Sequence, residues 1–201
     1  MPLGTWLKAG TSATALVLAM AGAATAAPAS SPAPAPAPAG ESSAALAAAV
    51  TLRYDDSRAA GWEAAITAGV ASWNANVSNV HLVEAAPGTT AEIVIVATTG
   101  WPQATLGPVR PGRQVRVELG SQAVDEGYNK TRIAAHELGH SLGLPDTKPG
   151  PCSQLMSGSS AGTACTNATP NATERSRVQS AYASGIAALA PTDDRVLIDA
   201  P

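Results

Sequence analysis

The 201-residue sequence contains no phenylalanine, and aromatic residues of all kinds make up only 3% of it. Hydrophobic content is an ordinary 45%, so a core must rely on Val, Ile, Leu and the four Trp. A strong net charge is also missing. The formal value of −3 argues against nucleic-acid binding and against a basic membrane-surface patch. The length allows one domain with targeting and tail segments.

Cysteine is scarce as well, with only Cys152 and Cys165 in the chain. Behind a targeting segment, an even cysteine count predicts one disulfide formed in an oxidising compartment. The alternative is a pair of free, buried thiols. A bridge across so short a loop would remove unfolded-state entropy worth roughly 3 kcal/mol.

The N-terminus has the pattern of a secretory signal peptide over residues 1–26. Lys8 precedes an uncharged stretch, Ala9–Ala27, dominated by Ala, Leu and Val. Ala24-Thr25-Ala26 fits the small-x-small cleavage rule, and Pro28 favours a cut after Ala26. The alternative is an uncleaved membrane anchor, although the stretch is short and weakly hydrophobic for a span.

Residues 27–48 are predicted to be a propeptide or linker, followed by a catalytic domain over 49–185 and a C-terminal tail over 186–201. Pro and Ala alternate between Pro32 and Ala39, which favours extended polyproline II rather than a packed structure. The linker has no cysteine, so it cannot supply a thiolate that would block a metal.

Hydrophobic periodicity predicts an α+β domain, with about three helices packed on a small twisted mixed sheet. Strands are expected at Thr51–Tyr54, Val80–Val83, Glu92–Val96 and Gln114–Leu119. Helices are expected around the one-sided set Trp62, Ile66, Val70 and Trp73, at Lys130–Leu142, and at Thr173–Leu189. Turn or capping residues are expected at Asp55–Ser57, an exposed loop at Gly100–Gly112, and a long loop at Thr147–Pro170.

The strongest chemical signal is His136-Glu137-Leu138-Gly139-His140 within the second predicted helix. Residues four apart lie on one helix face, so both imidazoles can meet one zinc ion at about 2.0–2.1 Å. Glu137 lies at the edge of that face. Its carboxylate can reach a water on the metal without being a ligand, which is the position of a general base.

A catalytic zinc needs a third protein ligand and one open position. Gly143 can take the left-handed backbone that reverses the chain after the helix, and Asp146 is then placed to return to the metal. The competing ligand is His81, the one other histidine of the chain, in a predicted strand.

These residues resemble a metzincin and, within that clan, the snapalysin family of small secreted bacterial neutral proteases, marked by Asp as third ligand. The resemblance covers roughly residues 50–185. Beyond the zinc motif it is carried by Ser72-Trp73-Asn74, Val77–Val80, Tyr128, Thr131-Arg132, Gly150–Ser153, Leu155–Gly158, Cys165–Asn167, Pro170–Ala172 and Glu174–Val178.

The resemblance implies that Met156 is the Met-turn residue beneath the zinc and that Cys152–Cys165 is the family disulfide. It also implies cleavage before a bulky aromatic residue. The family has a tyrosine near the metal where this chain has Lys148, which either stabilises the oxyanion or faces solvent.

The family also binds calcium through an Asp and a Thr just before the zinc helix. The matching positions here are Asn129 and Thr131. A neutral amide oxygen in place of a carboxylate predicts a weaker calcium site or none, and Asn129 is equally suited to be a helix cap.

The sequence therefore predicts a secreted, extracellular, monomeric zinc metalloendopeptidase that acts on protein or peptide substrates. Glu137 is the general base, and neither nucleic acid nor, after signal cleavage, a membrane is a partner. Two other classes stay open: a zinc-holding binding module without turnover, and an anchored surface protein.

Overall fold

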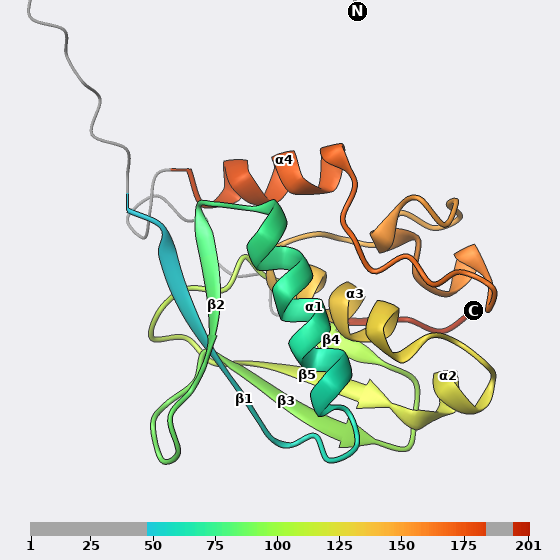
Figure 1. The fold of residues 1–201 in the computed structure, drawn as a ribbon, viewed down its shortest axis with the longest axis horizontal. Helices are drawn as coiled ribbons and strands as arrows, with labels where there is room; N and C mark the ends of the chain where they lie inside the picture. Colours follow the sequence, from blue (N-terminus) through green and yellow to red (C-terminus); the bar gives the residue numbers. More distant parts are fainter. Residues whose placement is uncertain (1–47, 184–194) are drawn as a thin grey trace, which may run out of the picture. The chain divides into compact units, whose positions relative to one another are not determined.

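A six-stranded mixed sheet frames the part of the chain that the structure, a computed structural model, describes, residues 48–183 and 195–201 (Figure 1). Its strands are β1 (Val50–Arg58), β2 (Val80–Glu84), β3 (Ile93–Thr98), β4 (Gln103–Thr105), β5 (Val115–Gly120) and β6 (Val196–Ile198), in the spatial order β2-β1-β3-β5-β4-β6. The pairs β1–β2, β1–β3 and β3–β5 are parallel, whereas β4 is antiparallel to β5 and β6. The predicted signal peptide and nearly all of the linker lie outside the described residues.

The strands follow the hydrophobic patterns expected for their positions. All four residues of Ile93–Val96 are buried, as expected for a central parallel strand covered on both faces. β5 alternates between buried Val115 and Val117 and exposed Arg116, so its predicted wet face is confirmed. The α+β class with a mixed sheet is therefore confirmed.

Two long helices, α1 (Glu63–Asn76) and α3 (Lys130–Ser141), pack against each other beside the sheet (Figure 1). Gly69 allows the close approach, because a Cβ built there would lie 3.0 Å from the Ala135 backbone nitrogen. The Trp73 indole Nε1 donates a hydrogen bond of 2.8 Å to the Ala135 carbonyl. The predicted α1 face is confirmed: Trp62, Ile66, Val70 and Trp73 are all in the core.

Three shorter helical elements complete the described fold: α2 (Ser121–Asp125), the 3₁₀ segment η1 (Leu155–Ala161) and α4 (Ala172–Ala181). α4 begins with a capping box between Asn171 and Glu174. The predicted helix to residue 189 was too long, because α4 ends at Ala181 and residues 182–183 form a turn. The rest of that prediction, 184–189, lies outside the described residues. In the described ranges no helix has the length and apolarity needed to cross a membrane.

Asp55–Ser57 was predicted to form a turn, and this was wrong. β1 continues through these residues to Arg58, with a register irregularity between Asp55, paired with Val94, and Arg58, paired with Val96. Pairing with β3 overrides the local turn preference, since ladder hydrogen bonds and neighbouring buried side chains outweigh weak propensities.

Gly100–Gly112 was predicted to be an exposed loop, and this too was wrong. The segment contains β4, and Leu106 and Val109 are buried. Its backbone is fastened to the end of α3, since Gly107 N donates to His140 O at 2.8 Å and Val109 N donates to Ser141 O at 3.0 Å. A Gly- and Pro-rich composition indicates an irregular backbone but does not show whether tertiary partners cover it.

Candidate metal centre

Helix α3 carries His136 and His140 on one buried face, one turn apart. The His136 Nδ1 hydrogen-bonds the Leu155 carbonyl at 3.0 Å, and the His140 Nδ1 hydrogen-bonds the Leu144 carbonyl at 2.7 Å. A carbonyl can only accept, so each Nδ1 carries the hydrogen and each Nε2 keeps a free lone pair. Both Nε2 atoms are thereby prepared as metal ligands.

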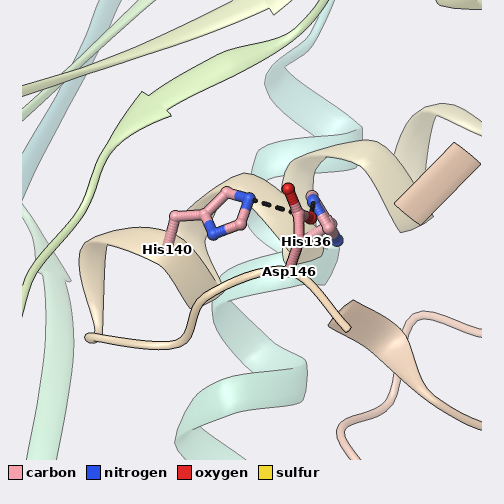
Figure 2. Close-up of side chains that lie close together, drawn as sticks. All are labelled: His136, His140 and Asp146. Carbon is pink, nitrogen blue, oxygen red and sulfur yellow. Dashed lines mark ion pairs between the residues drawn. The ribbon is translucent and has the colours of Figure 1, made fainter. Parts of the chain in front are cut away.

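Asp146 returns to these two histidines, as the sequence predicted, while His81 does not. Gly143 has φ of 99°, the left-handed conformation that reverses the chain after α3. The Asp146 Oδ1 then lies 3.3 Å from His136 Nε2 and 3.6 Å from His140 Nε2 (Figure 2). His81 is exposed on β2 and belongs to neither potential ligand group of the described residues.

The donor atoms of this triad fit a metal ion. Ligand atoms on a tetrahedral zinc, each at about 2.0 Å, lie roughly 3.3 Å from one another, close to the two separations above. The Nε2 atoms of His136 and His140 and the Oδ1 of Asp146 are buried without a hydrogen-bond partner. Leaving three buried polar atoms unpaired is costly, so the set requires a shared cation.

The charge around the triad also favours a cation. Burial lowers the pKa of His136, but the adjacent Asp146, Asp199 and Glu137 carboxylates outweigh it and raise this pKa to about 9. His140 is buried too and lies beside that imidazolium, so its pKa falls to about 4. Without a metal ion, His136 therefore holds a proton at the place where a divalent ion could bind instead.

Glu137 is completely buried next to the triad, and neither of its carboxylate oxygens has a hydrogen-bond partner. Burial raises its pKa well above the usual range, although the positive charge on His136 acts in the other direction. A raised pKa gives the Glu137 carboxylate a higher affinity for a proton than an exposed glutamate has.

Met156, the residue to which the resemblance gives the Met-turn role, packs against α3 at Gly139, between the two histidines of the motif. It is fully buried against α3, and a Cβ on Gly139 would lie only 2.6 Å from its sulfur. Gly139 is therefore the small residue of the motif that admits Met156. The Met156 carbonyl accepts a hydrogen bond of 2.8 Å from Thr147 N, which ties this turn to the segment that carries Asp146.

Arg132 and Glu174 hold the Met156 turn in place, and the sequence analysis assigned them no such role. The Arg132 guanidinium donates to the Gln154 carbonyl at 3.0 Å and to Ser157 Oγ at 3.0 Å. The Glu174 carboxylate accepts from Leu155 N at 3.2 Å and from Met156 N at 2.8 Å. For Arg132, the one signal in the sequence was its place in an apolar helix, one turn before His136.

Cys152 and Cys165 form a disulfide, with Cα atoms 5.4 Å apart, and no free cysteine occurs in the described residues. The bridge closes the long loop beyond α3. Just past the disulfide, the Asn167 carbonyl accepts a hydrogen bond of 2.7 Å from the Arg132 guanidinium. The disulfide therefore supports the same loop that Arg132 fastens to the metal helix.

Lys148 does not face solvent freely, because its ammonium group is paired within the protein. Its Nζ makes an ion pair of 2.5 Å with Asp199 Oδ1 and donates to the Ala200 carbonyl at 2.9 Å. Asp199 was not predicted to be a site residue, yet its Oδ2 lies 3.9 Å from His136 Nε2. No sequence signal pointed to it, because it lies far along the chain in the tail.

Asn129 caps α3, since its side chain accepts a 2.9 Å hydrogen bond from Arg132 N. In the part of the chain that the structure describes, both groups of His, Cys, Asp or Glu suited to a metal include His136, and neither includes a residue near Thr131. Calcium at Asn129 and Thr131 stays an untested prediction.

Comparison with known proteins places the chain among bacterial proteases. Residues 49–185 match the sequence model of the Streptomyces extracellular neutral proteinase (M7) family. An extracellular small neutral protease of Streptomyces coelicolor is 42% identical over 141 residues, which are 70% of this chain and 63% of that protein. The protein of the same name from Streptomyces caespitosus is 39% identical over 136 residues, which are 68% of this chain and 99% of that protein.

The matched residues span 60–63% of three longer relatives, those of S. coelicolor, Streptomyces sp. strain C5 and S. lividans. Among solved structures, the medaka hatching enzyme zinc-protease HCE-1 is 25% identical with a TM-score of 0.37, over 49% of this chain and 46% of that chain. Archaemetzincin from Methanopyrus kandleri is 14% identical with a TM-score of 0.40, over 67% of this chain and 96% of that chain. The family assignment rests on the sequence matches.

Proposed function

Because the chain belongs to the Streptomyces extracellular neutral proteinase (M7) family, we propose that it is a secreted zinc metalloendopeptidase acting on protein or peptide substrates. The observation that carries the proposal is the set of buried, unpartnered donor atoms on His136, His140 and Asp146, with Glu137 equally buried and unpartnered beside them. Three protein ligands and an adjacent carboxylate are what a hydrolytic zinc site requires.

Each residue has a separate task in this proposal. His136, His140 and Asp146 would hold the zinc ion, which when bound supplies Lewis-acid activation of a water molecule and of the substrate carbonyl. Glu137 would accept a proton from the attacking water and pass it to the leaving amine nitrogen. Its burial suits both halves of this transfer, because a raised pKa makes the protonated form accessible.

We propose further that cleavage is preferred before a bulky aromatic residue. The support is a narrow pocket beside His136, lined by Tyr128, Asn129, Arg132, Ile133, Gly158 and Asp199. Tyr128 and Ile133 give it apolar walls. Its free space is only 10 Å³, close to what a single water needs. An aromatic side chain would therefore have to displace part of the wall, and Asp199 and Gly158 are the parts that do not come from α3 or the segment just before it.

We do not extend the proposal to calcium. The Asn129 side-chain oxygen is already used as the N-cap of α3, and an amide is a weaker calcium ligand than a carboxylate.

The test of the general base is Glu137→Ala in zinc-loaded protein. We expect hydrolysis of casein or a peptide to fall by about 10²–10⁴-fold, because general-base catalysis contributes that much. Zinc measured by atomic absorption should stay at the wild-type level, since Glu137 is not a ligand. Glu126→Ala, an exposed glutamate, is the matched control. Chelator-insensitive hydrolysis, or unchanged activity in Glu137→Ala, would contradict the proposal.

A further inference from the structure

The tail segment, residues 195–201, adds a strand to the sheet directly beside the metal centre. β6 pairs antiparallel with β4, which would be the edge strand without it, with Val196 opposite Thr105 and Ile198 opposite Gln103. Two further backbone hydrogen bonds extend the ladder, from Leu106 N to Arg195 O at 2.8 Å and from Asp199 N to Pro102 O at 2.9 Å. An extended peptide substrate would add to a sheet in the same way, so the tail segment occupies an edge that a substrate could use.

This ladder brings the Asp199 side chain beside His136, one of the candidate zinc ligands. The carboxylate is 7% exposed, and its Oδ2 lies 3.9 Å from His136 Nε2, which is itself buried without a hydrogen-bond partner. Asp199, His136 and Glu137 form a second group of potential ligands, whose donor atoms all lie within 4.8 Å of one another. A zinc with three protein ligands keeps one position free, and a carboxylate can fill it.

The other oxygen of Asp199 has its own binding partners. Oδ1 accepts a hydrogen bond of 3.0 Å from Ser159 N and pairs with Lys148 Nζ. The next residue is held by the same two side chains, since the Ala200 carbonyl accepts from Lys148 Nζ at 2.9 Å and from Ser159 Oγ at 2.9 Å. Gly158 leaves the necessary room, because a Cβ built there would overlap the Asp199 carboxylate.

The rest of the tail segment is weakly packed. Val196 and Ile198 are 54% and 56% exposed, the largest exposures of any large hydrophobic residue in the described ranges. Little apolar burial therefore opposes its release. Backbone pairing and the polar contacts of Asp199 and Ala200 hold the tail segment in place. A bound metal would strengthen the polar contacts.

We propose that the tail segment is an inhibitory strand, in which Asp199 takes the fourth position on the zinc ion and Lys148 and Ser159 anchor it there. If the chain has the proposed protease function, on which this consequence rests, the full chain is held in a low-activity state until the tail segment is displaced. Lys148 is then a positioning residue that acts through Asp199 and not on the substrate.

The direct test is zinc-dependent hydrogen exchange of the backbone amides in β4 and β6. It uses the full chain with Glu137→Ala to prevent self-cleavage. Zinc should slow exchange of Leu106 and Asp199 amides at least tenfold if Asp199 is a ligand. Asp199→Asn should abolish that slowing while zinc content and the far-ultraviolet spectrum stay unchanged. Asp125→Asn, which removes an exposed carboxylate, is the matched control and should behave as the parent protein.

Equal zinc-dependent protection in Asp199→Asn, or no zinc effect in the parent protein, would overturn the inhibitory strand. Loss of the protection in Asp199→Asn supports it even if the chain with Glu137 intact cleaves no peptide, a result that would count against the proposed protease function alone. The two proposals therefore fail separately.

The activity arm uses the chain with Glu137 intact. We expect Asp199→Asn to raise kcat/KM at least tenfold over wild type, and Lys148→Met to raise it by a smaller factor. Lys148→Met added to Asp199→Asn should change kcat little, because its anchoring partner is already lost. A large fall in kcat in this double variant would instead assign Lys148 to the oxyanion and contradict its role as an anchor.

Discussion

At the residue scale, the candidate metal centre depends on a glycine, Gly139, as much as on its histidines. Gly139 stands between the two histidine ligands, and a Cβ there would meet Met156 Sδ at 2.6 Å and Trp73 Cζ2 at 3.1 Å. Both neighbours are fully buried, so neither can move freely. Packing, as well as helix geometry, therefore limits which residue can occupy the position of Gly139.

Gly139→Ala should consequently lower the free energy of unfolding by about 1–3 kcal/mol, the usual cost of overpacking a core. Higher helix propensity offsets part of this cost, by up to about 1 kcal/mol. Urea unfolding followed by fluorescence measures the effect. Gly100→Ala is the matched control, because a Cβ there meets nothing within 4 Å. A Gly139→Ala protein as stable as wild type would show that the Met156 turn can shift without cost.

At the element scale, α4 supports the candidate metal centre without supplying any of its proposed ligands. The Glu174 carboxylate caps its own helix through Asn171 N at 2.7 Å and also accepts from the backbone of Leu155 and Met156. One buried side chain thus joins the start of α4 to the turn beneath the zinc ligands. Arg132 makes the corresponding connection from α3.

Glu174→Gln should therefore destabilise the fold and loosen the metal centre together. An amide has one acceptor oxygen and presents an N–H donor towards backbone N–H groups, so at least one buried donor loses its partner. We expect a loss of about 1.5–3 kcal/mol in unfolding free energy, typical of hydrogen bonds to charged groups, and weaker zinc binding by competition titration. Glu84→Gln, at an exposed position on β2, should change neither. A stability loss with unaltered zinc affinity would separate α4 from the metal centre.

At the scale of the whole molecule, the proposed metal ion would join parts of the chain that are distant in sequence. α3 carries His136 and His140, the following loop carries Asp146, and the tail segment places Asp199 beside His136. Without a divalent ion, several buried donors lack partners, so folding stability and metal occupancy must be linked.

Removal of zinc by a chelator should therefore lower Tm, and added zinc should restore it. At a free zinc concentration of 100 times Kd, the linkage is worth about 2.7 kcal/mol. Scanning calorimetry of zinc-loaded, chelated and reloaded protein measures the shift. Asp146→Ala is the informative comparison, because its Tm should respond much less to the chelator. A wild-type Tm that ignores zinc would mean that the triad does not bind the ion tightly.

The zinc helix could be predicted in detail because its geometry is local. A four-residue spacing places His136 and His140 on one face of α3 whatever surrounds the helix, and Gly143 with Pro145 marks its end. The return of Asp146 was also predictable, since only two residues separate it from Gly143. The core face of α1 followed from periodicity in the same way.

Other features depended on pairing between distant segments and could not be predicted locally. β1 extends through Asp55–Ser57 because β3 pairs with it. The Gly- and Pro-rich segment is largely buried because its strand β4 pairs with β5 and β6 and its backbone bonds to the end of α3.

The sequence by itself determined the chemical groups of the candidate site: two histidines, a glutamate and an aspartate within eleven residues, ordered by helix periodicity and one glycine. Only the tertiary structure decided what else lies beside them. Asp199 reaches His136 through β6–β4 pairing, and Lys148 pairs with Asp199 there. Strand pairing over so long a separation depends on the whole folded sheet, and no local pattern in the tail segment encodes it.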